Sequence, residues 1–217
     1  GTRVDTERWR EWPTCLGEAA SSPVANTRAG GVGRDVVIWQ WALGDPTADL
    51  HDLISADKRD PTVNANGPLY GATELSKDYM PVLDPNTHVA SRVTLEVRDP
   101  LTPSTALTPP MLSSRYWGEE VIWDSQANAH SLAMDSQARV WIAARVRPGE
   151  TPDFCQAGSS HPSAQAFPIE RSSRQVEVYD PQIKEITTIN TCFGTHHLNF
   201  ADDDMLWFSG ENDPVVA

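Results

Sequence analysis

The chain has 217 residues, of which 39% are hydrophobic and eight are tryptophan, so it carries enough apolar material for a packed core and does not have the composition of a disordered protein. Thirty acidic side chains against seventeen basic ones give a formal net charge of −13, which disfavours binding to the phosphate backbone of nucleic acids. No apolar run approaches the ~20 residues that cross a bilayer, so we expect no transmembrane segment.

The N-terminal part of the chain predicts a loop followed by strands. Residues 1–34 are polar and are expected to form a loop-like extension. Residues 35–43 (DVVIWQWAL) have the β-rich pattern of a strand, which Gly44-Asp45-Pro46 ends. Residues 49–61 carry mixed charges and His51, and we expect a short helix or a long loop there. Residues 64–71 (NANGPLYG) read as a weak inner strand.

Two further strand pairs flank turns that begin with Asp-Pro. The first pair, 79–83 and 92–97, encloses Asp84-Pro85-Asn86-Thr87, and the second pair, 176–179 and 185–190, encloses residues 180–184. Residues 99–114 are rich in Pro, Thr and Ser and are expected to form a linker or surface loop.

Two stretches of the chain repeat one pattern. Residues 129–146 read AHSLAMDSQARVWIAARV, and residues 196–210 read HHLNFADDDMLWFSG. Each has a histidine near its start, alternates apolar residues, passes an acidic turn and resumes with an apolar residue and Trp, which predicts strand, tight turn, strand. Trp141 and Trp207 lie 66 positions apart, or 38 without the 28 residues 147–174. A period of about 40 residues built from short strands is typical of a β-propeller blade.

We therefore predict an all-β fold over residues 35–217: a partial β-propeller of four-stranded antiparallel blades. About three to four blades are expected, with the second over 64–97, the third over 128–190 and the fourth opening at His196. A ring of this kind closes with four to eight blades in general. The chain is thus expected to be a fragment whose edges pair with the rest of its own chain.

Four stretches resemble a known group of proteins: HDLISADKRDPTVNANGPLYG, YWGEEVIWDSQANAH, HPSAQAFPIERSSRQVEVYDP and TCFGTHHLNFADDDMLWFSG. They resemble secreted bacterial β-propeller proteins labelled carboxypeptidase-regulatory-like-domain-containing and, more distantly, virginiamycin B lyase (streptogramin lyase). The first resemblance implies a propeller fold and a secreted or periplasmic location. The second implies a lyase that opens a macrocyclic ester by elimination, with a histidine base and a magnesium ion near the central channel.

The first strand of each propeller blade lines the central channel, so polar residues where it starts are candidates for a binding site. We expect at least two of the following to line a functional pocket: Asn64, Asn66, Asn128, His130, His196 and His197. The alternative is that these side chains satisfy backbone groups and hold channel waters.

Histidine suits both proton transfer and metal binding near neutral pH. We therefore predict His130 and His197 as catalytic bases or metal ligands. Adjacent residues on a strand point to opposite faces, so at most one of His196 and His197 is expected to face the channel. Glu120 is predicted to complete a divalent-metal site for Mg²⁺ or Ca²⁺, or otherwise to be an exposed acid. Arg145 is predicted to bind an anionic substrate group, or otherwise to be solvated.

The predicted function is that of a secreted propeller enzyme, lyase- or hydrolase-type, acting on a small molecule or polymer at the channel mouth. The alternative is a non-catalytic propeller that binds a ligand or a protein. The three cysteines lie outside any C-x-x-C motif. A Cys155–Cys192 disulfide is expected in an oxidising compartment, which leaves Cys15; three buried thiols are the alternative.

Overall fold

A computed structural model of the chain describes residues 45, 47–97, 102–105, 123–145, 152–166 and 174–210. The predicted extension 1–34 and the predicted strand 35–43 lie outside these residues, as do Glu120 and most of the predicted linker 99–114.

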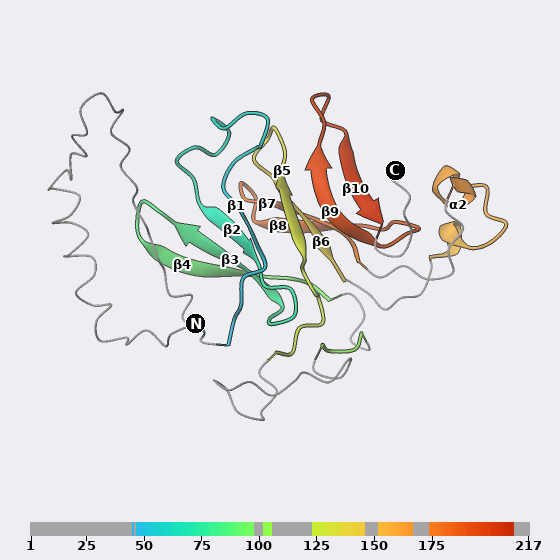
Figure 1. The fold of residues 1–217 in the computed structure, drawn as a ribbon, viewed down its shortest axis with the longest axis horizontal. Helices are drawn as coiled ribbons and strands as arrows, with labels where there is room; N and C mark the ends of the chain where they lie inside the picture. Colours follow the sequence, from blue (N-terminus) through green and yellow to red (C-terminus); the bar gives the residue numbers. More distant parts are fainter. Residues whose placement is uncertain are drawn as a thin grey trace, which may run out of the picture. The chain divides into compact units, whose positions relative to one another are not determined.

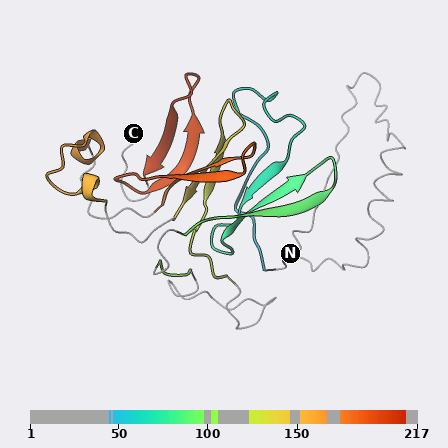
Figure 2. The same cartoon turned by 180° about the vertical axis from the view of Figure 1, so that it is seen from behind.

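The described residues form antiparallel sheets in which strands that are consecutive in sequence pair with each other (Figures 1 and 2). The first sheet contains β1 (Asp52–Ile54), β2 (Leu69–Ala72), β3 (Tyr79–Asp84) and β4 (Val89–Thr94). The second contains β5 (Ser131–Met134), β6 (Val140–Ala144), β7 (Gln175–Asp180) and β8 (Glu185–Ile189). The third contains β9 (Thr195–Phe200) and β10 (Leu206–Gly210), and the short helices η2 (Asp153–Cys155) and α2 (Pro162–Ala166) lie between β6 and β7.

The first strand of each sheet lies beside the first strand of the next sheet. The backbone N–H of Leu132 in β5 donates to the Asp52 carboxylate of β1 (2.9 Å). The N–H of Leu198 in β9 donates to the hydroxyl of Ser131 in β5 (3.3 Å). Inner strands that adjoin while the other strands extend outward are typical of propeller blades. The fold is therefore all-β and partially propeller-like, as the repeated pattern predicted.

Strands β5 and β6 of the second sheet are buried on both faces. Their side chains point alternately toward the first sheet and toward the third sheet. On one face, Leu132 and Ile142 pack into the core of the first sheet around Met80. On the other face, Ala133 and Ala143 pack with side chains of the third sheet, Leu198 and Phe200 among them. Strand β8, at the edge, alternates instead between exposed and half-buried residues. Because successive side chains of a strand point to opposite faces, β5 and β6 contribute to two cores, one on each side.

The structure corrects the predicted start of the first sheet. Residues 49–61, predicted as a helix or loop, contain strand β1. Residues 64–71, predicted as the inner strand, contain the last turns of the β1–β2 loop and most of β2, which is the second strand of the sheet. The misassignment arises because β1 has three residues, too few for an alternating pattern to be recognised.

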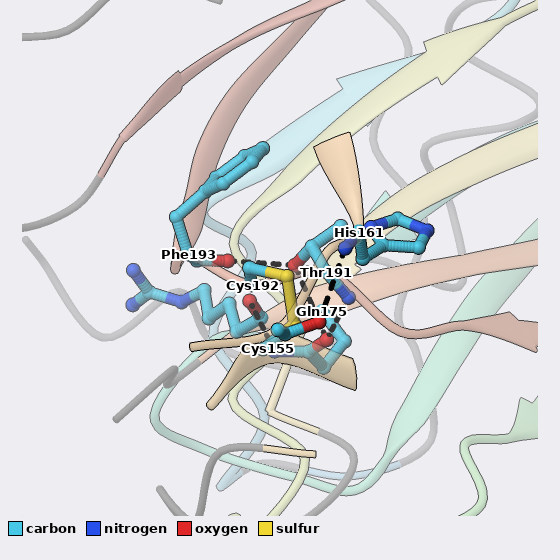
Figure 3. Close-up of a disulfide and its surroundings, with 8 residues drawn as sticks. Cys155, His161, Gln175, Thr191, Cys192 and Phe193 are labelled. Carbon is cyan, nitrogen blue, oxygen red and sulfur yellow. Dashed lines mark hydrogen bonds between the residues drawn. A yellow bond between two sulfur atoms is a disulfide. The ribbon is translucent and has the colours of Figure 1, made fainter. Parts of the chain in front are cut away.

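The insertion between β6 and β7 is fastened by a disulfide between Cys155 in η2 and Cys192, which precedes β9 (Figure 3). Both cysteines are fully buried and pack with Ala164 of α2. Beside the bridge, the hydroxyl of Thr191 donates to the carbonyl of Phe193 (2.6 Å), as Figure 3 shows. The predicted pairing of Cys155 with Cys192 is confirmed.

Candidate functional site: a histidine cluster

Successive sheets place a histidine at the start of the inner strand. The backbone N–H of His51 donates to the carbonyl of Ala72 (2.8 Å), and that of His130 donates in the same way to the carbonyl of Ala143 (2.8 Å). His196 occupies the equivalent position in the third sheet, because His130 and His196 both lie four residues before the last residue of their strands, β5 and β9. The repeat that builds the fold therefore also gathers imidazoles at one end of the inner strands.

A second histidine of the third sheet joins this group because of a β-bulge. The register of β9 and β10 shifts by one residue, so that His196 and His197 both lie opposite Ser209. A bulge redirects side chains that would alternate in a regular strand. Both rings consequently approach His130, contrary to the prediction that at most one of the two could face the site.

The histidine cluster, which comprises His51, His130, His196 and His197, is centred on His130. The centroid of the His130 ring lies 4.2 Å from that of His51 and 4.1 Å from that of His196, with the rings nearly parallel in the second pair (13°). The His197 centroid lies 5.1 Å from that of His130 and is tilted by 53°. His130 is buried, whereas His197 is exposed and His196 is half-buried, so the cluster opens to solvent on the β9 side.

Glu74, in the β2–β3 loop, connects two members of the cluster. Its Oε1 lies 2.7 Å from Nδ1 of His130, and its Oε2 lies 3.1 Å from Nδ1 of His51. Behind it, Nη2 of Arg174 lies 3.4 Å from Oε1. Arg174 is buried and donates from Nη2 to Oδ1 of Asn128 (2.7 Å). A chain of polar contacts therefore runs from the core to the imidazoles.

The environment of His130 favours its neutral form. Burial lowers the pKa of His130 below its usual value, the hydrogen bond with Glu74 opposes this, and the positive charge of Arg174 adds to the lowering. Among the described residues no hydrogen-bond partner reaches Nε2 of His130, although that atom is buried. An unpaired buried nitrogen is costly, on the order of 1–3 kcal/mol. Such an atom is available to accept a proton or bind a metal ion.

The cluster can hold a metal ion in two overlapping ways. The ligand atoms of His130, His196 and His197 lie within 4.8 Å of one another, and so do those of His51, Glu74 and His130. Imidazole nitrogens suit zinc, copper, nickel and iron, whereas Mg²⁺ and Ca²⁺ prefer oxygen ligands. The donor set of the first group is all nitrogen and therefore does not match the predicted Mg²⁺ or Ca²⁺.

A small cavity adjoins the cluster on the side of the first sheet. It has a volume of about 30 Å³, and its lining includes His51, Glu74, Thr73 and Trp123. Because one water needs about 10–15 Å³ of such space, the cavity has room for about two water molecules. Water molecules can therefore lie next to Glu74 and His51.

The other predicted site residues have different positions. Asn64 and Asn66 lie in the β1–β2 loop, after the end of β1 and so at the opposite end of this strand from His51; the amide of Asn64 donates to the carbonyls of Ser55 and Pro68. Asn128 is buried, and its Oδ1 accepts a hydrogen bond from Nη2 of Arg174 (2.7 Å). Arg145 follows β6 and is half-buried, and its backbone N–H bonds the carbonyl of Ala127.

Sequence reasoning missed two members of the site. His51 was assigned to a charged loop because β1 was not recognised, although the shared histidine at strand starts was a usable signal. Glu74 had no signal, since its contact with His130 joins residues 56 positions apart.

The described residues thus define an all-β, propeller-like protein with a histidine cluster where its inner strands begin. No protein-family model matches the sequence, and no curated protein matches it. In the described part of the chain, the helices lack the length and apolar character needed to cross a membrane.

Proposed function

We propose that the histidine cluster is the transition-metal centre of an enzyme that carries out lyase- or hydrolase-type chemistry at the mouth of a propeller channel. The observation that carries this proposal is the buried Nε2 of His130, which lacks a hydrogen-bond partner among the described residues. The rings of His196 and His197 both contact that of His130. Buried polar atoms are normally paired, so an unpaired nitrogen among other imidazoles supports a ligand role.

The ligand set we propose is His130, His196 and His197. Three imidazoles with one coordination position left for water or substrate are a common donor set of catalytic zinc. A metal ion held there would lower the pKa of bound water and polarise a carbonyl. This assignment replaces Mg²⁺ and Ca²⁺ by zinc or a similar ion, since the donors are nitrogen.

His51 is the residue we propose for proton transfer. Its side chain is 40% exposed, it stacks on His130, and it borders the water-sized cavity. An imidazole in this position can take a proton from water in a hydrolysis or from a substrate carbon in an elimination. Arg145, half-buried after β6, is proposed to bind an anionic group of the substrate, a small molecule or a polymer.

A secreted or periplasmic location forms part of the proposal. The buried Cys155–Cys192 bridge supports it, because such bonds persist in oxidising compartments.

A non-catalytic propeller that binds a ligand is the second candidate. The small volume of the cavity, about 30 Å³, favours it, because this cavity is too small to enclose a substrate. Turnover of an ester or a polymer that is lost with His51→Ala, while metal binding remains, separates the enzyme from this alternative.

Titration with Zn²⁺, followed by isothermal calorimetry, tests the proposal. We expect one zinc ion per chain, with affinity lowered on the order of 100-fold or more in His130→Ala. The matched control is His88→Asn, which removes an exposed histidine from the β3–β4 turn; asparagine tolerates the left-handed backbone there (φ 57°). Equal zinc affinity of His130→Ala and the control, or no stoichiometric binding by the unmodified protein, refutes the metal centre.

A further inference from the structure

The two oxygens of the Glu74 carboxylate each contact Nδ1 of a different imidazole. Oε1 lies 2.7 Å from Nδ1 of His130, and Oε2 lies 3.1 Å from Nδ1 of His51. The contact with His130 is a hydrogen bond, and an ionised carboxylate only accepts, so the proton resides on Nδ1 of His130. The contact with His51 is at ion-pair distance, and a proton on Nδ1 of His51 is the one that the carboxylate attracts. In a neutral imidazole, the lone pair is then on Nε2. Glu74 therefore orients two rings at once.

Glu74 is itself held firmly from several sides. Arg174 lies 3.4 Å from Oε1 and is buried. The backbone N–H of Glu74 donates to the carbonyl of Ala129 (2.8 Å), next to His130. The β2–β3 loop, which contains Glu74, is bridged by a hydrogen bond in which the hydroxyl of Thr73 donates to the carbonyl of Tyr79 (2.8 Å). These contacts fix the carboxylate relative to β5.

Charge decides between two roles for Glu74. Its carboxylate could bind a metal ion together with His51 and His130, or it could act only through the two rings. The guanidinium of Arg174 already lies beside this carboxylate and repels a further cation at the same place. The second role is therefore the one that the contacts favour.

We propose that Glu74, held by Arg174, is a positioning residue that keeps His51 and His130 in the Nδ1–H tautomer, with Nε2 available for a ligand or a proton. For His130, this inference rests on the proposed metal centre, because Nε2 is the nitrogen assigned to the metal. Carboxylates that fix the tautomer of a metal-binding histidine in this way strengthen metal binding.

The test combines ring-nitrogen NMR with zinc binding. Long-range ¹H–¹⁵N spectra of the metal-free protein, recorded above the titration range of its histidines, are expected to show both His51 and His130 protonated at Nδ1. In Glu74→Gln the amide keeps one accepting oxygen, so at least one of the two rings is expected to change to the Nε2–H tautomer. Zinc affinity is expected to fall about 10–100-fold.

Glu96→Gln is the matched control, because it removes the same charge from an exposed residue and should change neither readout. The inference is overturned if both rings of the unmodified protein carry the proton on Nε2. It is also overturned if Glu74→Gln leaves tautomers and zinc affinity unchanged, or if the protein binds two zinc ions and Glu74→Gln binds one, because Glu74 is then a ligand.

The NMR measurement on the unmodified protein requires no variant to fold. It also separates the two proposals: a protein that binds no zinc but shows both Nδ1–H tautomers loses the metal centre and keeps the positioning role of Glu74.

Discussion

Removing the disulfide is expected to destabilise the protein by an amount that follows from the position of the bridge. Cys155 and Cys192 close a loop with a sequence separation of 37 residues that includes α2, β7 and β8. In the chain-entropy model, a loop of this length restricts the unfolded chain by about 4 kcal/mol at 25 °C. Replacing both cysteines by alanine should remove this stabilisation.

The assay is thermal unfolding followed by circular dichroism or calorimetry. For a protein of this size, each kcal/mol shifts Tm by about 2–4 °C, so Cys155→Ala/Cys192→Ala should unfold about 8–16 °C below the unmodified protein. Cys15→Ala is the control, since Cys15 is not part of this bridge. A loss below about 3 °C in the double variant, or an equal loss in the control, refutes the expectation.

Three further predictions concern stability. Asp57→Asn should lower Tm at pH 7, and the Tm difference from the unmodified protein should close below about pH 4. Hydrogen bonds from Arg59 hold the pKa of Asp57 below its usual value, so the stabilisation they give is lost as the carboxylate is protonated. A Tm difference that widens on acidification contradicts this. Ile142→Ala should cost about 2–5 kcal/mol in urea unfolding and Ile142→Val about 0.5–1.5, because this fully buried side chain fills the core of the first two sheets; equal losses argue against that packing. Asp135→Ala should cost about 1–3 kcal/mol and alter Trp141 fluorescence, since Asp135 is buried and accepts from the indole N–H (2.8 Å); an unchanged midpoint and spectrum contradict this.

The fold class could be predicted from the sequence because the two strand–turn–strand repeats are local. In both, the last paired residues of the hairpin enclose a five-residue loop, 135–139 and 201–205. In such hairpins every second residue is apolar, and this alternation can be recognised within one stretch of sequence. The Cys155–Cys192 pairing could be predicted as well, because three cysteines allow few other pairings.

The candidate site was predicted only in part, because its geometry depends on pairing between distant segments. The sequence placed His130, His196 and His197 near the start of inner strands, but the approach of both His196 and His197 to His130 depends on a register shift against β10. A register is set by the partner strand, so residues 195–200 alone do not reveal a bulge. Likewise, the place of Glu74 beside His130 follows from the packing of the first sheet on the second.

X-ray absorption at the zinc edge tests the central claim most directly. The zinc-loaded protein is expected to show about three nitrogen scatterers at ~2.0–2.1 Å, with the outer-shell features of imidazole, and to lose one imidazole in His197→Ala. A first shell of oxygen atoms without imidazole features would contradict a metal centre built from His130, His196 and His197.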